Sequence, residues 1–123
     1  MKKIILDCDP GQDDAVALAL AMAAKDEIEI LGVTTVAGNV PLNLTQRNAR
    51  IMCEMCHRPD VKVYAGAEKP MAQELVTAEH VHGKSGLDGI EIYEPSHSLE
   101  EKHAIDFIIE SCLAAELNSL ILV

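Results

Sequence analysis

The stretch Ile4-Ile-Leu-Asp-Cys-Asp-Pro-Gly-Gln-Asp-Asp14, near the start of the 123-residue chain, decides the fold. It joins three apolar residues to a Pro-Gly turn, and the residues that follow, 15–24, are all apolar. We therefore expect a buried strand that ends in acids, a sharp turn, and a helix whose first turn carries two more acids. A turn from a strand directly into a helix is typical of an α/β fold.

Four carboxylates fall within eight positions of this stretch: Asp7, Asp9, Asp13 and Asp14. Side chains alternate along a strand, so Asp7 and Asp9 share one face, while Asp13 and Asp14 suit a helix N-terminus. Two like charges about 4 Å apart repel by roughly 4 kcal/mol at an effective dielectric constant of about 20. The group therefore predicts a bound cation, shared protons or solvent, and oxygen ligands favour calcium or magnesium over zinc. A solvated acidic turn is the alternative.

The rest of the chain alternates between strand and helix patterns. The expected elements are a strand at 27–36, a helix at 41–57, a strand at 61–65, a helix at 102–116 and a strand at 119–123. This order predicts a doubly wound, mainly parallel α/β sheet, in which ligands bind beyond the carboxyl ends of the strands. Asp7, Asp9, Asn39 and the loop 66–89 would then lie at one edge of the sheet.

Two segments in the second half of the chain carry signals of their own. Residues 66–97 contain several glycines and prolines without a sustained period, and a loop of that length is more often functional than idle. Ser98 and Glu101 have the spacing of a capping box, which would open the helix at 102–116. Its apolar positions predict that this helix buries Ile105, Ile108, Ile109 and Leu113.

Composition and charge exclude some classes of partner. The formal net charge of −10 argues against binding to nucleic acids or to anionic membranes, both of which require basic patches. Lys2 and Lys3 precede only three apolar residues, too few for a signal peptide, and no apolar run approaches the ~20 residues of a membrane span. We expect a single domain in the cytoplasm, with all four cysteines reduced.

Several motifs in this chain resemble those of one enzyme family, the inosine–uridine preferring nucleoside hydrolases. The segments that carry the resemblance are Asp7–Ala15, Val33–Asn39, Arg47–Ala49, Tyr64–Gly66 and His80–Gly86. They occur in the family's order and at close to its spacing. The resemblance implies calcium-dependent hydrolysis of the N-glycosidic bond of ribonucleosides to free base and ribose, in purine or pyrimidine salvage. Full-length members are homo-oligomers, dimers or tetramers.

The resemblance also implies roles for the acids. Asp9 would be the general base and a calcium ligand, Asp14 a second calcium ligand, and Asp13 a contact of the ribose hydroxyls. Asp7 would touch the calcium ligands rather than the ion and orient them, although a charged strand end explains it equally well. The chemistry is consistent, because a divalent ion acidifies a water molecule and a neighbouring carboxylate takes its proton.

Two further residues match the family's motifs. Asn39 would contact a sugar hydroxyl, and otherwise it is a turn asparagine that tolerates a left-handed conformation. His82 would lie near the nucleobase and help to protonate the leaving group, and otherwise it is a loop histidine in solvent. Zinc binding by His80 and His82 is disfavoured because no third ligand is near in sequence. Cys53 and Cys56 are best interpreted as part of a packed helix face, since the pair sits late in a helix.

Two alternative functions stay open at the level of sequence. Ile-Ile-Leu-Asp-Cys-Asp9 also resembles the strand and DxD motif of haloacid-dehalogenase-type phosphatases, in which Asp7 would be the nucleophile. The other alternative is a non-catalytic fragment or metal-binding half-site. Members of the nucleoside hydrolase family are much longer and take further calcium ligands from downstream residues. We therefore expect residues 1–123 to be the N-terminal part of one such domain, ending after its fourth strand.

Overall fold

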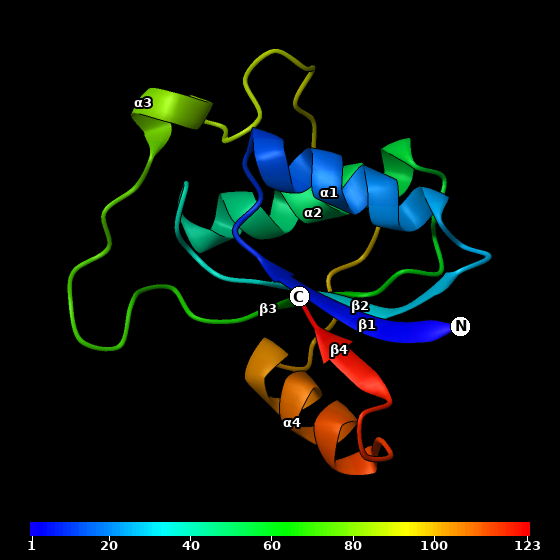
Figure 1. Cartoon of the computed structure of the whole chain (residues 1–123). Helices are drawn as coiled ribbons and strands as arrows, with labels where there is room; N and C mark the ends of the chain where they lie inside the picture. Colours follow the sequence, from blue (N-terminus) through cyan, green and yellow to red (C-terminus); the bar gives the residue numbers. More distant parts are fainter.

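All residues from 1 to 123 are described by the computed structural model, which forms one four-stranded sheet with helices on both faces (Figure 1). The elements in chain order are β1 (Lys2–Cys8), α1 (Gln12–Ala23), β2 (Ile28–Thr35), α2 (Leu42–Met55), β3 (Val63–Ala65), α3 (Glu79–His82), α4 (Ala104–Ala114) and β4 (Leu120–Leu122). All strand pairs are parallel, in the order β3-β2-β1-β4. The predicted α/β class and parallel sheet are confirmed.

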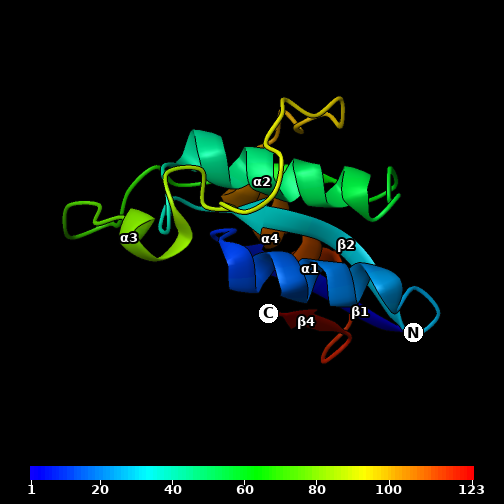
Figure 2. The same cartoon turned by 90° about the horizontal axis from the view of Figure 1, so that it is seen from above.

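The strand order explains where a site can form. From β1 the chain moves outward through β2 to β3, and then returns to place β4 on the other side of β1. Helices α1 and α2 lie side by side over one face of the sheet, and α4 lies on the opposite face (Figures 1 and 2). The direction of winding therefore reverses beside β1, and open α/β sheets bind ligands at the carboxyl ends of the strands at such a point.

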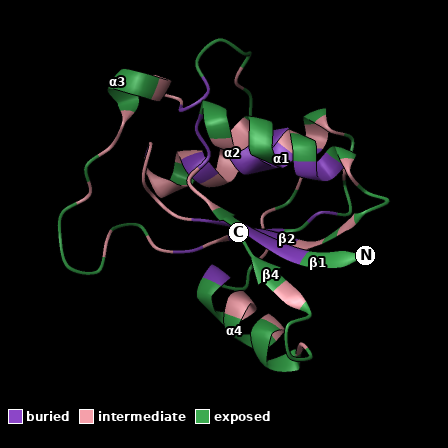
Figure 3. Cartoon of the chain, viewed as in Figure 1, coloured by how far each residue is buried: buried purple, intermediate pink, exposed green.

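The hydrophobic core lies between the sheet and the α1–α2 layer (Figure 3). Its buried members are Ile4, Leu6, Leu18, Ala21, Met22, Val33, Ala49, Met52, Cys53, Val61 and Val63. Cys53 is buried in this core and Cys56 packs against it, as expected of a packed helix face, and all four cysteines are free. This core holds the carboxyl ends of β1 and β2 in place.

The predicted capping box at Ser98 and Glu101 is wrong. The helix begins at Ala104, and the side chain of His103 caps it by accepting a hydrogen bond from the backbone N–H of Ile105. Leu99, which lies between Ser98 and Glu101, instead forms an isolated parallel bridge with Val63. The chain is therefore paired with a strand at the place where the capping box would have started a helix. A tertiary pairing has thus overridden a local signal.

The predicted burial of α4 is also wrong at three of four positions. Ile105, Ile109 and Leu113 are exposed, and Ile108 is half-buried. The helix touches the sheet through a different stripe, in which Ala104 is buried and the Phe107 ring stacks on the Tyr64 ring at a centroid distance of 3.9 Å. Because α4 is apolar on both sides, its sequence did not specify which side faces the sheet.

The segment 66–97 is mostly irregular, as expected, but it contains the single helical turn α3. This turn lies at the same edge of the molecule as the start of α1 (Figure 1). None of the four helices combines the length and the apolar character needed to cross a membrane.

Candidate active site

The turn after β1 and the turn after β2 are locked together at the carboxyl edge of the sheet. The backbone N–H of Asn39 donates to Asp9 Oδ2 at 2.8 Å, and its side-chain Nδ2 donates to the Asp9 carbonyl oxygen, also at 2.8 Å. Gly38 is required here, because a Cβ at this position would overlap the Asp9 carboxylate. Asn39 therefore fixes both the backbone and the carboxylate of Asp9.

Asp14 lies in the first turn of α1, against the Asp9 carboxylate. Burial raises the pKa of Asp14, and the negative charges of Asp13 and Asp9 raise it further. No lysine or arginine forms an ion pair with Asp7, Asp9 or Asp14. The group is therefore an uncompensated concentration of negative charge of the kind that favours a cation or a proton.

Asp7 is bonded to the segments that flank β1 on both sides. Its Oδ1 accepts a hydrogen bond of 2.5 Å from Thr34 Oγ1 on the adjacent strand, while its backbone N–H donates to the Val123 carbonyl oxygen. Asp7 and Asp14 both line a small hollow of about 120 Å³ at the end of β1. Burial, followed by the charge of Asp14, raises the pKa of Cys8, so this neighbouring thiol stays protonated.

His82 ends α3 and reaches back to the start of α1. Its Nδ1 accepts a hydrogen bond of 3.3 Å from the backbone N–H of Gln12, and its Nε2 lies 4.0 Å from Asp13 Oδ1. A backbone N–H can only donate, so in the neutral ring the proton sits on Nε2. A Cβ at Gly11 would stand 2.7 Å from Asn39 Nδ2 and 2.8 Å from His82 Nδ1, which shows how closely these segments converge.

The structure therefore brings together five of the predicted site residues. Asp9, Asp13, Asp14, Asn39 and His82 converge on one turn, with Asp7 beside them. They come from three separate segments of sequence. The sequence profile described as inosine-uridine preferring nucleoside hydrolase matches residues 4–123. The chain belongs to this family.

Three relatives illustrate the similarity to the nucleoside hydrolase family. An uncharacterized protein of Schizosaccharomyces pombe is 55% identical over 89% of this chain and 35% of its own length. An inosine-uridine preferring nucleoside hydrolase of Crithidia fasciculata is 43% identical over 99% of this chain and 39% of its own length. The solved structure of a purine-preferring ribonucleoside hydrolase from Gardnerella vaginalis matches with a TM-score of 0.85 and 32% identity, over 98% of this chain and 39% of that one.

This nucleoside hydrolase chain thus spans between about a third and two-fifths of the length of those relatives. Within it, no group of three or more histidine, cysteine, aspartate or glutamate side chains is arranged to hold a metal ion. Asp9 and Asp14 do fit part of a site for a hard cation, because they offer carboxylate oxygens, lie against each other and lack a basic partner. Two carboxylates alone supply only part of the coordination shell of such a cation.

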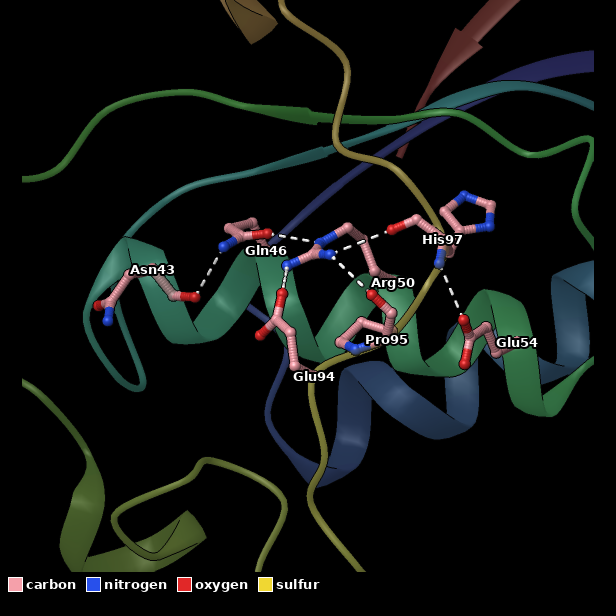
Figure 4. Close-up of polar contacts among 7 residues, drawn as sticks. All are labelled: Asn43, Gln46, Arg50, Glu54, Glu94, Pro95 and His97. Atoms are coloured by element: carbon pink, nitrogen blue, oxygen red, sulfur yellow. Dashed lines mark hydrogen bonds and ion pairs between the residues drawn. The ribbon is translucent and has the colours of Figure 1, made fainter.

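The loop after His82 is anchored to α2 by a row of polar side chains (Figure 4). Arg50 is buried and donates through Nη1 to the carbonyl oxygens of His97 and Pro95, at 3.0 and 3.4 Å, while its Nη2 pairs with Glu94 at 2.8 Å. One turn further on, Glu54 accepts from the backbone N–H of His97 at 2.8 Å. These bonds hold the segment 94–97 against the helix.

Three residues that shape this candidate site are not evident from the sequence. Thr34 holds Asp7, Gln12 holds His82 and also donates through its side chain to the Asp88 carbonyl oxygen, and Asn48 lies beneath both loops. Thr34 could not be told from an ordinary β-branched strand residue. Asn48 did carry a signal, because a polar amide in the middle of an amphipathic helix needs buried partners.

Proposed function

We propose that this chain carries the acidic, sugar-binding part of a calcium-dependent ribonucleoside hydrolase, which cleaves the N-glycosidic bond to free base and ribose. One observation carries the proposal: Asp9 and Asp14 lie against each other at the carboxyl end of β1, without a basic partner, and Asn39 and His82 contact the same turn. The names of the relatives from Crithidia fasciculata and Gardnerella vaginalis support the same substrate class.

Asp9 is suited to the role of general base. Its Oδ2 is occupied by the Asn39 N–H, which leaves Oδ1 to accept the proton of an attacking water molecule. Asp9 and Asp14 would together hold the calcium ion, which supplies positive charge that acidifies a water molecule at the site. Asp7, fixed by Thr34 beside the same hollow, would orient the ligand carboxylates.

The sugar and the base would lie on either side of this turn. Asp13 is exposed in the first turn of α1 and offers its carboxylate to the ribose hydroxyls. Asn39 already uses its backbone N–H and its Nδ2 on Asp9, so its Oδ1 is the atom that can accept from a sugar hydroxyl. His82 carries its proton on Nε2, which faces Asp13 and can donate a hydrogen bond to the departing base.

The wider proposal places the chain as the N-terminal part of a single nucleoside hydrolase domain in the cytoplasm, acting in nucleoside salvage as a dimer or tetramer. Family membership argues against the haloacid-dehalogenase type of phosphatase. A specific observation does favour a second candidate, a calcium-binding half-site without turnover. The chain covers at most 39% of these relatives' length, and no third metal ligand of the His, Cys, Asp or Glu type joins Asp9 and Asp14.

The deciding experiment measures ribose release from inosine and from uridine by the 123-residue chain, with calcium and with a chelator. The variant Asp9→Asn removes the base, and Asp26→Asn is the matched control because Asp26 is exposed in the turn between α1 and β2. We expect calcium-dependent release by the wild type and by the control, reduced at least about 100-fold in Asp9→Asn.

The other outcomes separate the candidates. Release that persists in chelator or in Asp9→Asn would refute the proposed mechanism. Calorimetric calcium binding that is lost in Asp9→Asn, without any ribose release, would identify the half-site. Cleavage of a generic phosphoester, without release of ribose, would restore the phosphatase alternative.

A further inference from the structure

Asn48 has no role in the proposed chemistry, yet it touches both loops that form the site. It lies near the middle of α2 and its side chain is fully buried. Its Nδ2 donates to the Pro10 carbonyl oxygen at 3.1 Å and to the Ser85 carbonyl oxygen at 2.8 Å. Pro10 follows Asp9 directly and Ser85 lies three residues after His82, so a single amide group spans the acid turn and the histidine loop.

The other links between these two segments are exposed to solvent. Gln12 donates its backbone N–H to His82 Nδ1 at 3.3 Å and its side chain to the Asp88 carbonyl oxygen at 2.8 Å, and both bonds are exposed. Asn48 provides the more buried link: its bond to the Pro10 carbonyl oxygen is buried and its bond to the Ser85 carbonyl oxygen is partly buried, so water competes less for these acceptors. It also comes from a third element, so it can set the spacing of the two loops independently of α1.

The chemistry of Asn48 argues that its donors are what matter. Its Oδ1 is buried and has no hydrogen-bond partner, which costs free energy that an apolar side chain of similar size would avoid. Simple packing in the centre of α2 would be served better by leucine. Both hydrogens of Nδ2, in contrast, have acceptors, and each acceptor belongs to a loop that bears a site residue.

We infer that Asn48 is a positioning residue, which sets the distance between the Asp9 turn and the His82 imidazole. The inference rests on the proposed function, in which Asp9 acts on the sugar side and His82 on the base side of one glycosidic bond. Without the Asn48 amide, the hydrogen bonds that remain between the histidine loop and α1 are the exposed ones from Gln12, and the imidazole loses its fixed orientation.

The test uses the calcium-free chain and ¹⁵N NMR of the His82 ring. In the wild type, Nδ1 accepts from the Gln12 N–H and the proton sits on Nε2. Asn48→Leu removes both donors, and Asn48→Asp removes them while keeping the shape of the side chain. We expect both variants to shift the Nδ1 and Nε2 resonances toward a mixture of tautomers, and to speed exchange of the Gln12 amide about fivefold.

The matched control is Thr45→Val. Thr45 is also fully buried in α2, and its hydroxyl bonds only to the Leu42 carbonyl oxygen within the same helix. This control should leave the His82 resonances unchanged. Unchanged His82 resonances in either folded Asn48 variant, or equal shifts in Thr45→Val, would overturn the inference. The NMR readout needs neither calcium nor turnover, so failure of the proposed function in the ribose assay is a separate result.

Discussion

Asp14 shows how a single residue links stability to ligand binding. Its pKa is raised above the ordinary value of 3.8, first by burial and then by the charges of Asp13 and Asp9. The folded chain therefore holds the Asp14 proton more tightly than the unfolded chain does. In the absence of calcium, the free energy of unfolding should fall as the pH rises from about 4 through the folded-state pKa.

Replacing Asp14 by asparagine should remove the free-energy cost of holding a partly buried carboxylate beside Asp13 and Asp9. It should also remove the response to calcium. We expect Asp14→Asn to be more stable than the wild type at neutral pH in chelator, and its stability to depend less on pH. Calcium at 100 times its dissociation constant should add about 2.7 kcal/mol to the wild type and much less to the variant. Urea unfolding at several pH values, with and without calcium, measures both effects. Identical responses in the two proteins would contradict this role.

The sequence singled out side chains that the fold brings together, but it did not single out the residues that support them. Asp9, Asp13, Asp14, Asn39 and His82 were all expected at the site, and the structure brings all five together. Asn48, in contrast, acts on backbone carbonyl oxygens, which every residue possesses. A sequence shows which side chains are present, but it does not show which backbone carbonyl oxygens lie near them. Contacts of that kind become visible only in the folded structure.

At the scale of elements, α2 organises the irregular second half of the chain. Gln46, Arg50 and Glu54 follow one another at four-residue spacing and therefore lie on one face of the helix. Gln46 accepts from Arg50 Nε at 2.7 Å, which orients the guanidinium toward the 94–97 segment (Figure 4). An irregular segment without a core of its own is thus held by one helix face.

The prediction for this element compares the two partners of one ion pair. Arg50→Leu leaves the carbonyl oxygens of Pro95 and His97 without their donor and should cost about 2 kcal/mol of unfolding free energy. Glu94→Gln removes only the exposed partner, whose charge is well solvated, and should cost less than about 0.5 kcal/mol. Urea unfolding of both variants tests this. Equal losses would show that the ion pair, rather than the carbonyl contacts, holds the segment.

Element boundaries were predicted well where the pattern was local and badly where a distant partner intervened. The first two helices and all four strands lie where their periodicity placed them. Most of their ends fall within two residues of the predicted ones. Helix α4 also begins two residues from its predicted start, but its N-cap was predicted wrongly, because Leu99 pairs with Val63, which is 36 positions away in sequence. Capping signals describe isolated helices, and a competing strand contact can displace them.

For the molecule as a whole, the two faces of the sheet are covered unequally. The α1–α2 layer buries the core, whereas much of α4 is exposed (Figure 3). Leu113 on α4 is 82% exposed, and Leu117, three residues after the helix ends, is 92% exposed. β4 is likewise apolar and partly exposed. Exposed apolar side chains of this kind bind apolar probes and favour association.

Polar substitution on this face should therefore change surface behaviour without changing stability. We expect Leu113→Gln to lower the fluorescence of a bound apolar dye and to leave the urea midpoint within about 0.5 kcal/mol of the wild type. Leu20→Gln is the control, because Leu20 is 72% exposed but lies on α1, across the sheet. A loss of dye binding in the control as large as that in Leu113→Gln would show that the α4 face is not the binding surface.

The pairing of β1 with β4 has a consequence for the order of folding. The backbone N–H of Asp7 donates to Val123, and the N–H of Val123 donates to Ile5, so the acidic turn is braced on one side by the far end of the sequence. Residues 9–119 lie between these strands and must leave the ribosome before the pairing can form. Closing so long a segment is entropically slow. A nascent chain can thus complete the β1–β2–β3 half of the sheet early, while the edge beside the acids stays open until β4 arrives.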